Sequence, residues 1–201
     1  MKSLMEPEPT ERELGLFNFI YTKASQLLNR DGGLQPIAFF RVGAQPRMQG
    51  PRVGMIVPVK LDMPNSDEGK VAVAEALRQI IKKLDADLVL MVLESWMVKP
   101  NEEEAAYIQK HGEFKVRPSQ HPNRIEIVLF TLTKPNGDSW SCWAEIQRDA
   151  QNRPSIPNEP PKLEYLQTGG RFGNLFTEEG GETDEPTAAT TTIGTTNTTG
   201  T

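Results

Sequence analysis

Cysteine, histidine and long apolar runs are scarce in this 201-residue chain. Its only cysteine is Cys142, so no internal disulfide can form, and it has just two histidines. The longest apolar run, residues 88–93, has the size of a strand and falls far short of the roughly 20 residues of a membrane span. The first residues lack the basic and then apolar layout of a signal peptide. These absences indicate a cytoplasmic protein with no membrane association.

Hydrophobic residues are also few, and this predicts that part of the chain does not pack. They make up 37% of the sequence, whereas a globular chain has roughly 45–50% when glycine is included. Residues 151–201 carry seven acidic and three basic side chains, which accounts for −4 of the total charge of −5. An acidic and then Thr-rich stretch cannot repay its ordering entropy. We expect a flexible N-terminus (1–9), a single domain (10–156), a partly ordered or docking segment (157–176) and a disordered tail (177–201).

Periodicity and turn signals predict the elements of the domain. Thr10 with Glu13, and Asn101 with Glu104, fit capping boxes at the starts of two helices. The residues 134–138 have the composition of a tight hairpin. Helices are predicted over residues 10–32, 65–85 and 101–112, and strands over residues 34–42, 53–61, 88–98, 125–133 and 140–148.

The strand that begins at residue 88 is predicted to be central. Residues 88–93 are apolar on both alternating faces, which is typical of a strand covered on both sides. The other strands follow one another mostly through hairpins. We therefore expect an α+β fold with a mainly antiparallel sheet of about five strands and two main helices packed on one face.

A long connection at 99–124 holds both histidines and several basic residues, and long ordered loops are often functional. In one interpretation it forms an anion or ligand site, with Arg117 and Arg124 as donors and His121 as proton carrier. In the other, the loop is structural. Arg124 then pairs with a carboxylate, and His121 packs or bonds the backbone.

Two further side chains belong to types that can carry out catalysis. Glu94 shares a strand face with Trp96, so it is a carboxylate in a partly apolar setting that could serve as a general acid or base. Its structural alternative is a pair with Arg124. Cys142 is expected to be a buried, inert thiol. No spacing is diagnostic of a metal site or a nucleophile, so neither a metal nor a cofactor is expected.

Two segments offer other surfaces for partners. Arg41, Arg47 and Arg52 flank or lie in a Gly- and Pro-rich loop that could touch nucleic acid, although charged hairpin loops are usually only solvated. Near the C-terminus, apolar residues interrupt polar sequence and could align on a helix that forms on binding. That candidate docking motif consists of Arg171, Phe172, Leu175 and Phe176. Alternatively, this segment folds back and covers its own sheet.

Three stretches carry a resemblance: Glu94-Ser95-Trp96-Met97, residues 118–126, and residues 144–149. They resemble a group of small bacterial and phage proteins without an assigned activity. In that group a hydrophobic strand ends in Glu-Ala-Trp-Met, a Pro-Ser-x-His-Pro-x-Arg-x-Glu element follows, and a strand with Ile-x-Arg closes the domain. Residues 84–150 are covered, with Ser95 in place of Ala. The resemblance implies a phage or mobile-element origin in a bacterial host cell, and a functional set of Glu94, Trp96, His121, Arg124 and Glu126.

The first functional hypothesis is a non-enzymatic binding or accessory protein that engages a protein partner. Its candidate surfaces are a sheet edge, the loop at 99–124 and the docking motif. A separate ligand or anion site is expected from Arg117, Arg124, Trp96 and Glu126. The alternative is a small hydrolase or nucleotide-binding enzyme in which Glu94 and His121 act on an anionic substrate held by the arginines. Nucleic-acid binding is a third, less favoured possibility, and no residue pattern favours a particular oligomeric state.

Overall fold

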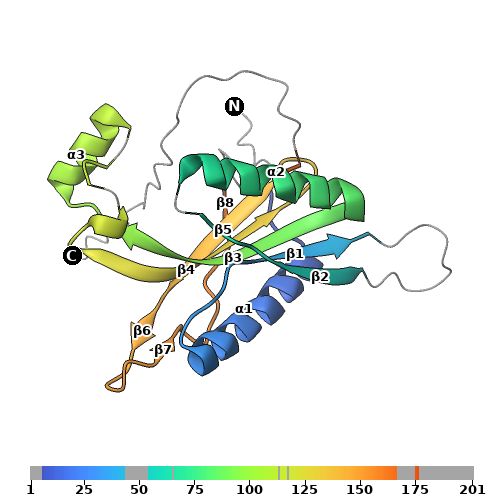
Figure 1. Ribbon diagram of the computed structural model, residues 1–201, viewed down its shortest axis with the longest axis horizontal. Helices are drawn as coiled ribbons and strands as arrows, with labels where there is room; N and C mark the ends of the chain where they lie inside the picture. The colour runs from blue at the N-terminus through green and yellow to red at the C-terminus, as the bar shows by residue number, and fades with distance from the viewer. Residues whose placement is uncertain are drawn as a thin grey trace, which may run out of the picture.

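The computed structural model describes residues 6–43, 54–64, 66–112, 114–116, 118–166 and 175–176. The helices and strands in chain order are α1 (Glu11–Asp31), β1 (Ile37–Val42), β2 (Met55–Lys60), α2 (Asp67–Leu84), β3 (Ala86–Val98), α3 (Glu102–His111), the 3-10 helix η1 (Pro118–Gln120), β4 (Arg124–Thr133), β5 (Ser139–Glu145), β6 (Gln147–Arg148), β7 (Pro154–Ser155) and β8 (Glu164–Tyr165). Six of the strands form one sheet in the order β2-β1-β3-β4-β5-β8, in which every neighbouring pair is antiparallel (Figure 1). The short β6–β7 hairpin projects beyond it (Figure 1).

The helix boundaries are set by caps that the sequence predicts. The Thr10 hydroxyl accepts a hydrogen bond from the Glu13 backbone N–H, and the Glu13 carboxylate accepts one from the Thr10 N–H, which together form the capping box that begins α1. Asn101 and Glu104 form the same reciprocal pair at the start of α3. Gly32 ends α1 with φ of 78°, a conformation that costs glycine little.

The two long helices cover opposite faces of the sheet (Figure 1). Successive residues of β3 point to opposite sides, so Leu88, Leu90 and Val92 face α1, while Val89 and Met91 face α2. The predicted α+β fold with an antiparallel sheet is confirmed, but the prediction that both main helices share one face is wrong. A continuous apolar run in the central strand has two faces to bury, and each needs its own cover.

The core on the α1 side is built around aromatic rings. Phe17 meets Phe130 edge to face, with ring centroids 5.6 Å apart, and Tyr21 lies 5.2 Å from Phe130. The Tyr21 hydroxyl donates a 2.7 Å hydrogen bond to the Pro157 carbonyl. Burial raises the pKa of Tyr21 to about 12, with the nearby Cys142 as a smaller cause. The core extends past residue 156, the expected end of the domain, because the segment after it contributes the buried Leu163.

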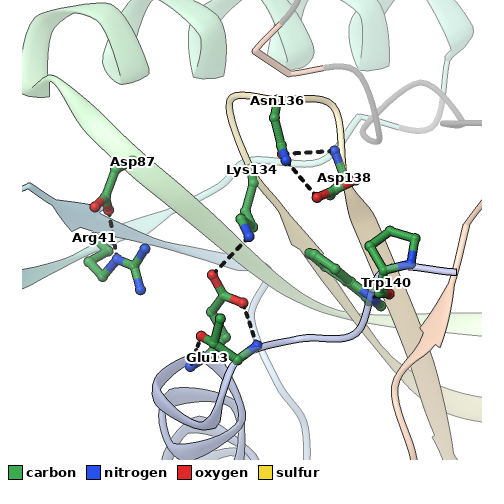
Figure 2. A network of polar contacts seen from close by, with 9 residues as sticks. Glu13, Arg41, Asp87, Lys134, Asn136, Asp138 and Trp140 are labelled. Carbon is green, nitrogen blue, oxygen red and sulfur yellow. Dashed lines mark hydrogen bonds and ion pairs between the residues drawn. The ribbon is translucent and has the colours of Figure 1, made fainter. Parts of the chain in front are cut away.

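A polar network lies where the N-terminus of α1 meets the β4–β5 turn (Figure 2). Glu13, only 3% exposed, accepts the capping bond and pairs with Lys134, whose Nζ lies 3.3 Å from Glu13 Oε1. The Trp140 indole N–H donates to the Pro7 carbonyl at 2.9 Å. These contacts attach the first described residues to the β4–β5 hairpin, whose turn occupies the predicted residues 134–138.

The edge strand β2 is protected against further pairing. Leu61 N donates to the Pro36 carbonyl at 2.8 Å, which fixes the backbone groups of this segment that face β1. Since groups alternate along a strand, Pro58, opposite Phe39, has its nitrogen facing outward. Proline has no N–H, so this edge lacks a donor that an added strand would need.

Candidate functional site

The central strand β3 changes character at Glu94. Residues 88–92 are buried, whereas Glu94 is exposed and Trp96 is 38% exposed. Helix α1, which covers this face of the sheet, also ends at this level. The Glu94 carboxylate accepts a 2.6 Å hydrogen bond from Leu34 N, and Leu34 lies two residues after the C-cap of α1. The second half of β3 therefore extends past the end of the helix and presents side chains to solvent.

Strand register gathers four polar and aromatic residues on this uncovered part of the α1 side. Trp96 pairs with Glu126, and Val98 pairs with Arg124, so these side chains share one face of β3 and β4. Arg148 in β6 reaches the same face, with Nη2 and Nε 2.8 and 2.9 Å from Glu126 Oε2. We call this group the Trp96 surface; its members are Trp96, Arg124, Glu126 and Arg148.

Arg124 is fixed in place by an aromatic ring and a backbone carbonyl. Its guanidinium carbon lies 4.5 Å from the centroid of the Trp96 ring, a cation–π stack, and its Nη1 donates to the Ser119 carbonyl at 2.8 Å. Within the described part of the chain, no carboxylate lies within ion-pair distance of Arg124. The sequence left open a structural pair between Arg124 and Glu94, and that pair does not form.

Glu94 and His121, the two catalytic candidates, have separate structural partners. Glu94 bonds the chain that leaves α1, as described above. His121 is 6% exposed and places Nε2 2.7 Å from Glu104 Oε1, while its Nδ1 accepts from Asn123 N at 3.1 Å. Because Nδ1 is an acceptor here, we assign the ring proton to Nε2, which donates to Glu104. His121 thus adopts the structural arrangement that the sequence left open.

The His121–Glu104 pair attaches α3 to the beginning of β4. No residue of α3 is buried, and Figure 1 shows the helix standing apart from the sheet. Glu104 also accepts the capping bond from Asn101 N, and this bond, followed by the one from His121, holds the pKa of the Glu104 carboxyl below its usual range. The long connection is therefore ordered at this point by charge-assisted hydrogen bonds.

Several residues singled out from the sequence lie elsewhere or outside the described residues. Arg41 is neutralised by Asp87, with Nε 2.6 Å from Oδ1 (Figure 2). Leu175 is 1% exposed in the core on the α2 side, with Phe176 packed against that core, which corresponds to the alternative that this segment folds back over its own sheet. The residues that lie outside the described part are Arg47, Arg52, Arg117, Arg171 and Phe172, together with the expected tail at 177–201.

Arg148 is the member of the Trp96 surface that was not predicted from the sequence. It lies in the short β6 strand, which ends the stretch that was expected to be one continuous strand. The Ile146 N–H bonds the Glu126 carbonyl at 2.9 Å, and this contact keeps the chain beside β4 long enough to bring Arg148 to Glu126. The only available signal was the Ile-x-Arg element of the resemblance, here Ile146-Gln147-Arg148.

The remaining chemistry of the described residues is limited. No group of three or more His, Cys, Asp or Glu side chains in these ranges is arranged to hold a metal ion. Cys142 is 5% exposed in the core, and burial raises the pKa of its thiol to about 12, with Glu164 as a smaller cause. A thiol that stays protonated is a poor nucleophile. None of the described helices is long and apolar enough to span a membrane.

Comparisons with known proteins add no relative. No known family matches the chain, no curated protein is detectably similar in sequence, and no solved structure is detectably similar in fold. The resemblance noted from the sequence stays a prediction.

Proposed function

We propose that this protein is a non-enzymatic binding module that engages a protein partner through the Trp96 surface. The observation that carries the proposal is the exposed Trp96 ring with Arg124 stacked on it and fixed by Ser119. Tryptophan and arginine are the side chains most enriched among the energetic centres of protein interfaces. A stack that is already ordered loses little conformational entropy when a partner binds.

The use of the other polar groups supports binding over catalysis. A hydrolase or nucleotide-binding enzyme would need Glu94 and His121 to converge on a substrate held by arginines. Instead, Glu94 bonds the segment after α1, and His121 bonds Glu104 and Asn123. The contacts of both candidates serve the fold, whereas the Trp96 ring and Arg124 stay accessible on this side of the sheet.

Charge gives no support to a nucleic-acid partner. The net charge of the chain is −5, and two arginines that could bind phosphates already have carboxylate partners. Arg41 pairs with Asp87, and Arg148 pairs with Glu126. A polyanion gains affinity by contacts with several uncompensated cations, so this arrangement favours a protein partner.

The proposal is tested by quantitative affinity purification of the full chain from its own host cells. Wild type is compared with Trp96→Ala and with Phe19→Ala, a control that removes another exposed aromatic ring, on α1, whose ring contact is with Lys23. We expect at least one protein to be retained by wild type and the control and lost with Trp96→Ala. If every retained protein binds the Trp96→Ala variant equally, the proposal is wrong.

A further inference from the structure

We infer that the Trp96 surface selects an acidic side chain of the partner protein, which binds Arg124 beside the Trp96 ring. This inference rests on the proposed function and names the chemistry of the partner. Arg124 is exposed, its position is fixed by the Ser119 carbonyl and the indole, and its charge has no partner among the described carboxylates. A guanidinium has five N–H donors, and one of them is used in this arrangement.

The charge of the surroundings favours a single carboxylate over a polyanion. Of the two arginines of the Trp96 surface, Arg148 is neutralised by Glu126, so Arg124 supplies the one uncompensated positive charge. Glu94 and Glu126 lie on the same face of the sheet as Arg124. A nucleic-acid backbone or a phosphate cluster would meet these two carboxylates, whereas one acidic side chain can bind the guanidinium and avoid them.

Glu126 adds a complementary acceptor beside the ring. Both close contacts from Arg148 go to Glu126 Oε2, so Oε1 has no hydrogen-bond donor among the described residues. Glu126 is paired directly with Trp96 across the strands, so the two residues lie side by side on this face of the sheet. The surface thus offers a donor group, an aromatic ring and an acceptor, which fits a protein segment whose acidic side chain neighbours an apolar residue and a free N–H.

The test selects binders from a displayed library of random 12-residue peptides with the full chain as the immobilised target. Parallel selections use Arg124→Glu, Arg124→Gln and the control Lys83→Glu, which makes the same sign change on an exposed part of α2. The selected peptides and a random-sequence oligonucleotide are then tested for binding to wild type and to Trp96→Ala. Wild type and Lys83→Glu are expected to select peptides with Asp or Glu at one fixed position. Arg124→Glu is expected to select Lys or Arg there, and Arg124→Gln to weaken the wild-type peptides by about tenfold or more.

Three outcomes would overturn the inference. One is the absence of any selected peptide whose binding depends on Trp96, and another is selected peptides with no preferred acid. The third is a surface that binds an oligonucleotide but none of the peptides. If affinity purification still finds a partner that depends on Trp96 while charge reversal leaves peptide preference unchanged, the acidic specificity fails and the proposed function stands. If neither experiment depends on Trp96, both fail.

Discussion

The two halves of β3 differ although they belong to one continuous strand. Residues 86–92 lie between α1 and α2, and the side chains of Leu88, Val89 and Leu90 are fully buried. Past Leu93 the strand continues for five residues beyond the end of α1, where Glu94 and Trp96 are exposed on the side that α1 covers further back. The same β3–β4 hydrogen-bonded pairing therefore supports buried core side chains in the first half and exposed side chains in the second.

This difference shows how a small domain can hold a recognition group rigidly. Trp96 and Glu126 are placed by the β3–β4 register, and that register is fixed by the buried pairs Leu90–Leu132 and Val92–Phe130 in the first half. A one-residue slip would turn these side chains away from the α1 core that they fill and toward the opposite face of the sheet, so the core specifies the positions on the open half as well. A surface on strands is held more firmly than one on a loop.

The comparison predicts that stability depends on the first half. Phe130→Ala removes a fully buried ring that contacts Phe17 and Tyr21, and we expect it to lower the free energy of unfolding by about 3–5 kcal/mol. Urea denaturation followed by circular dichroism measures this. A loss below about 1 kcal/mol would mean that the aromatic core carries little of the stability.

Alkaline pH should lower the free energy of unfolding through Cys142, which lies in the same α1-side core as Phe130. Its pKa is raised to about 12 in the folded state from an ordinary 9.0, so its contribution is complete below pH 9 and is lost as pH rises toward 12, because the unfolded thiol ionises first. Cys142→Ala should reduce this slope by up to about 1.4 kcal/mol per pH unit. Urea titrations at several pH values test it; identical slopes for the variant and wild type would contradict the burial of this thiol.

Beyond the second half of β3, α3 should depend on its link to His121. Glu104→Ala removes both the capping bond and the His121 contact, so we expect amide exchange in α3 to become several-fold faster while β4 is unchanged. Glu103→Ala, in the same exposed first turn, is the control. Since the pKa of Glu104 is lowered, its stabilising effect is present above the ordinary value near 4.5 and is lost as pH falls through the lowered one. Equal exchange in the two variants would refute the link.

The smallest effect on stability is expected on the open half. Trp96→Ala removes a side chain that is 38% exposed, and we expect a loss below about 1 kcal/mol. Phe19→Ala, on an exposed part of α1, should behave alike in denaturation and differ only in partner binding. A loss for Trp96→Ala near that of Phe130→Ala would mean that the ring is part of the core, and the contrast between the halves would disappear.

Local signals predicted much of this fold, and long-range contacts accounted for most of what was missed. The capping boxes at Thr10 and Asn101 and the central position of β3 follow from residue types and spacing, and they are confirmed. The resemblance, and no local signal, implied a set that includes Trp96 and Glu126, and these two residues are neighbours in the β3–β4 register. The hydrogen bond between Glu94 and Leu34 joins segments 60 residues apart, so no periodicity in the sequence predicts it.

The placement of α2 shows the same limit. Its apolar stripe marked a face to bury but not the side of the sheet that would receive it. In the structure α2 covers the face opposite α1, where its apolar stripe forms one core with Val89 and Met91. The two apolar faces of residues 88–93 contained this information, since a strand buried on both sides requires two covers.

The most direct measurement is site-specific photo-crosslinking of the full chain in its own host cells. A photoreactive phenylalanine derivative is placed at position 96, and at position 19 as the control, since both positions hold exposed aromatic residues. We predict a discrete protein adduct from position 96 that is lost when Arg124→Glu is added, and none of that mass from position 19. The same adduct from both positions, or no adduct from position 96, would contradict the assignment of the Trp96 surface as a protein-recognition site. An adduct at position 96 that ignores Arg124→Glu would contradict only the acidic specificity.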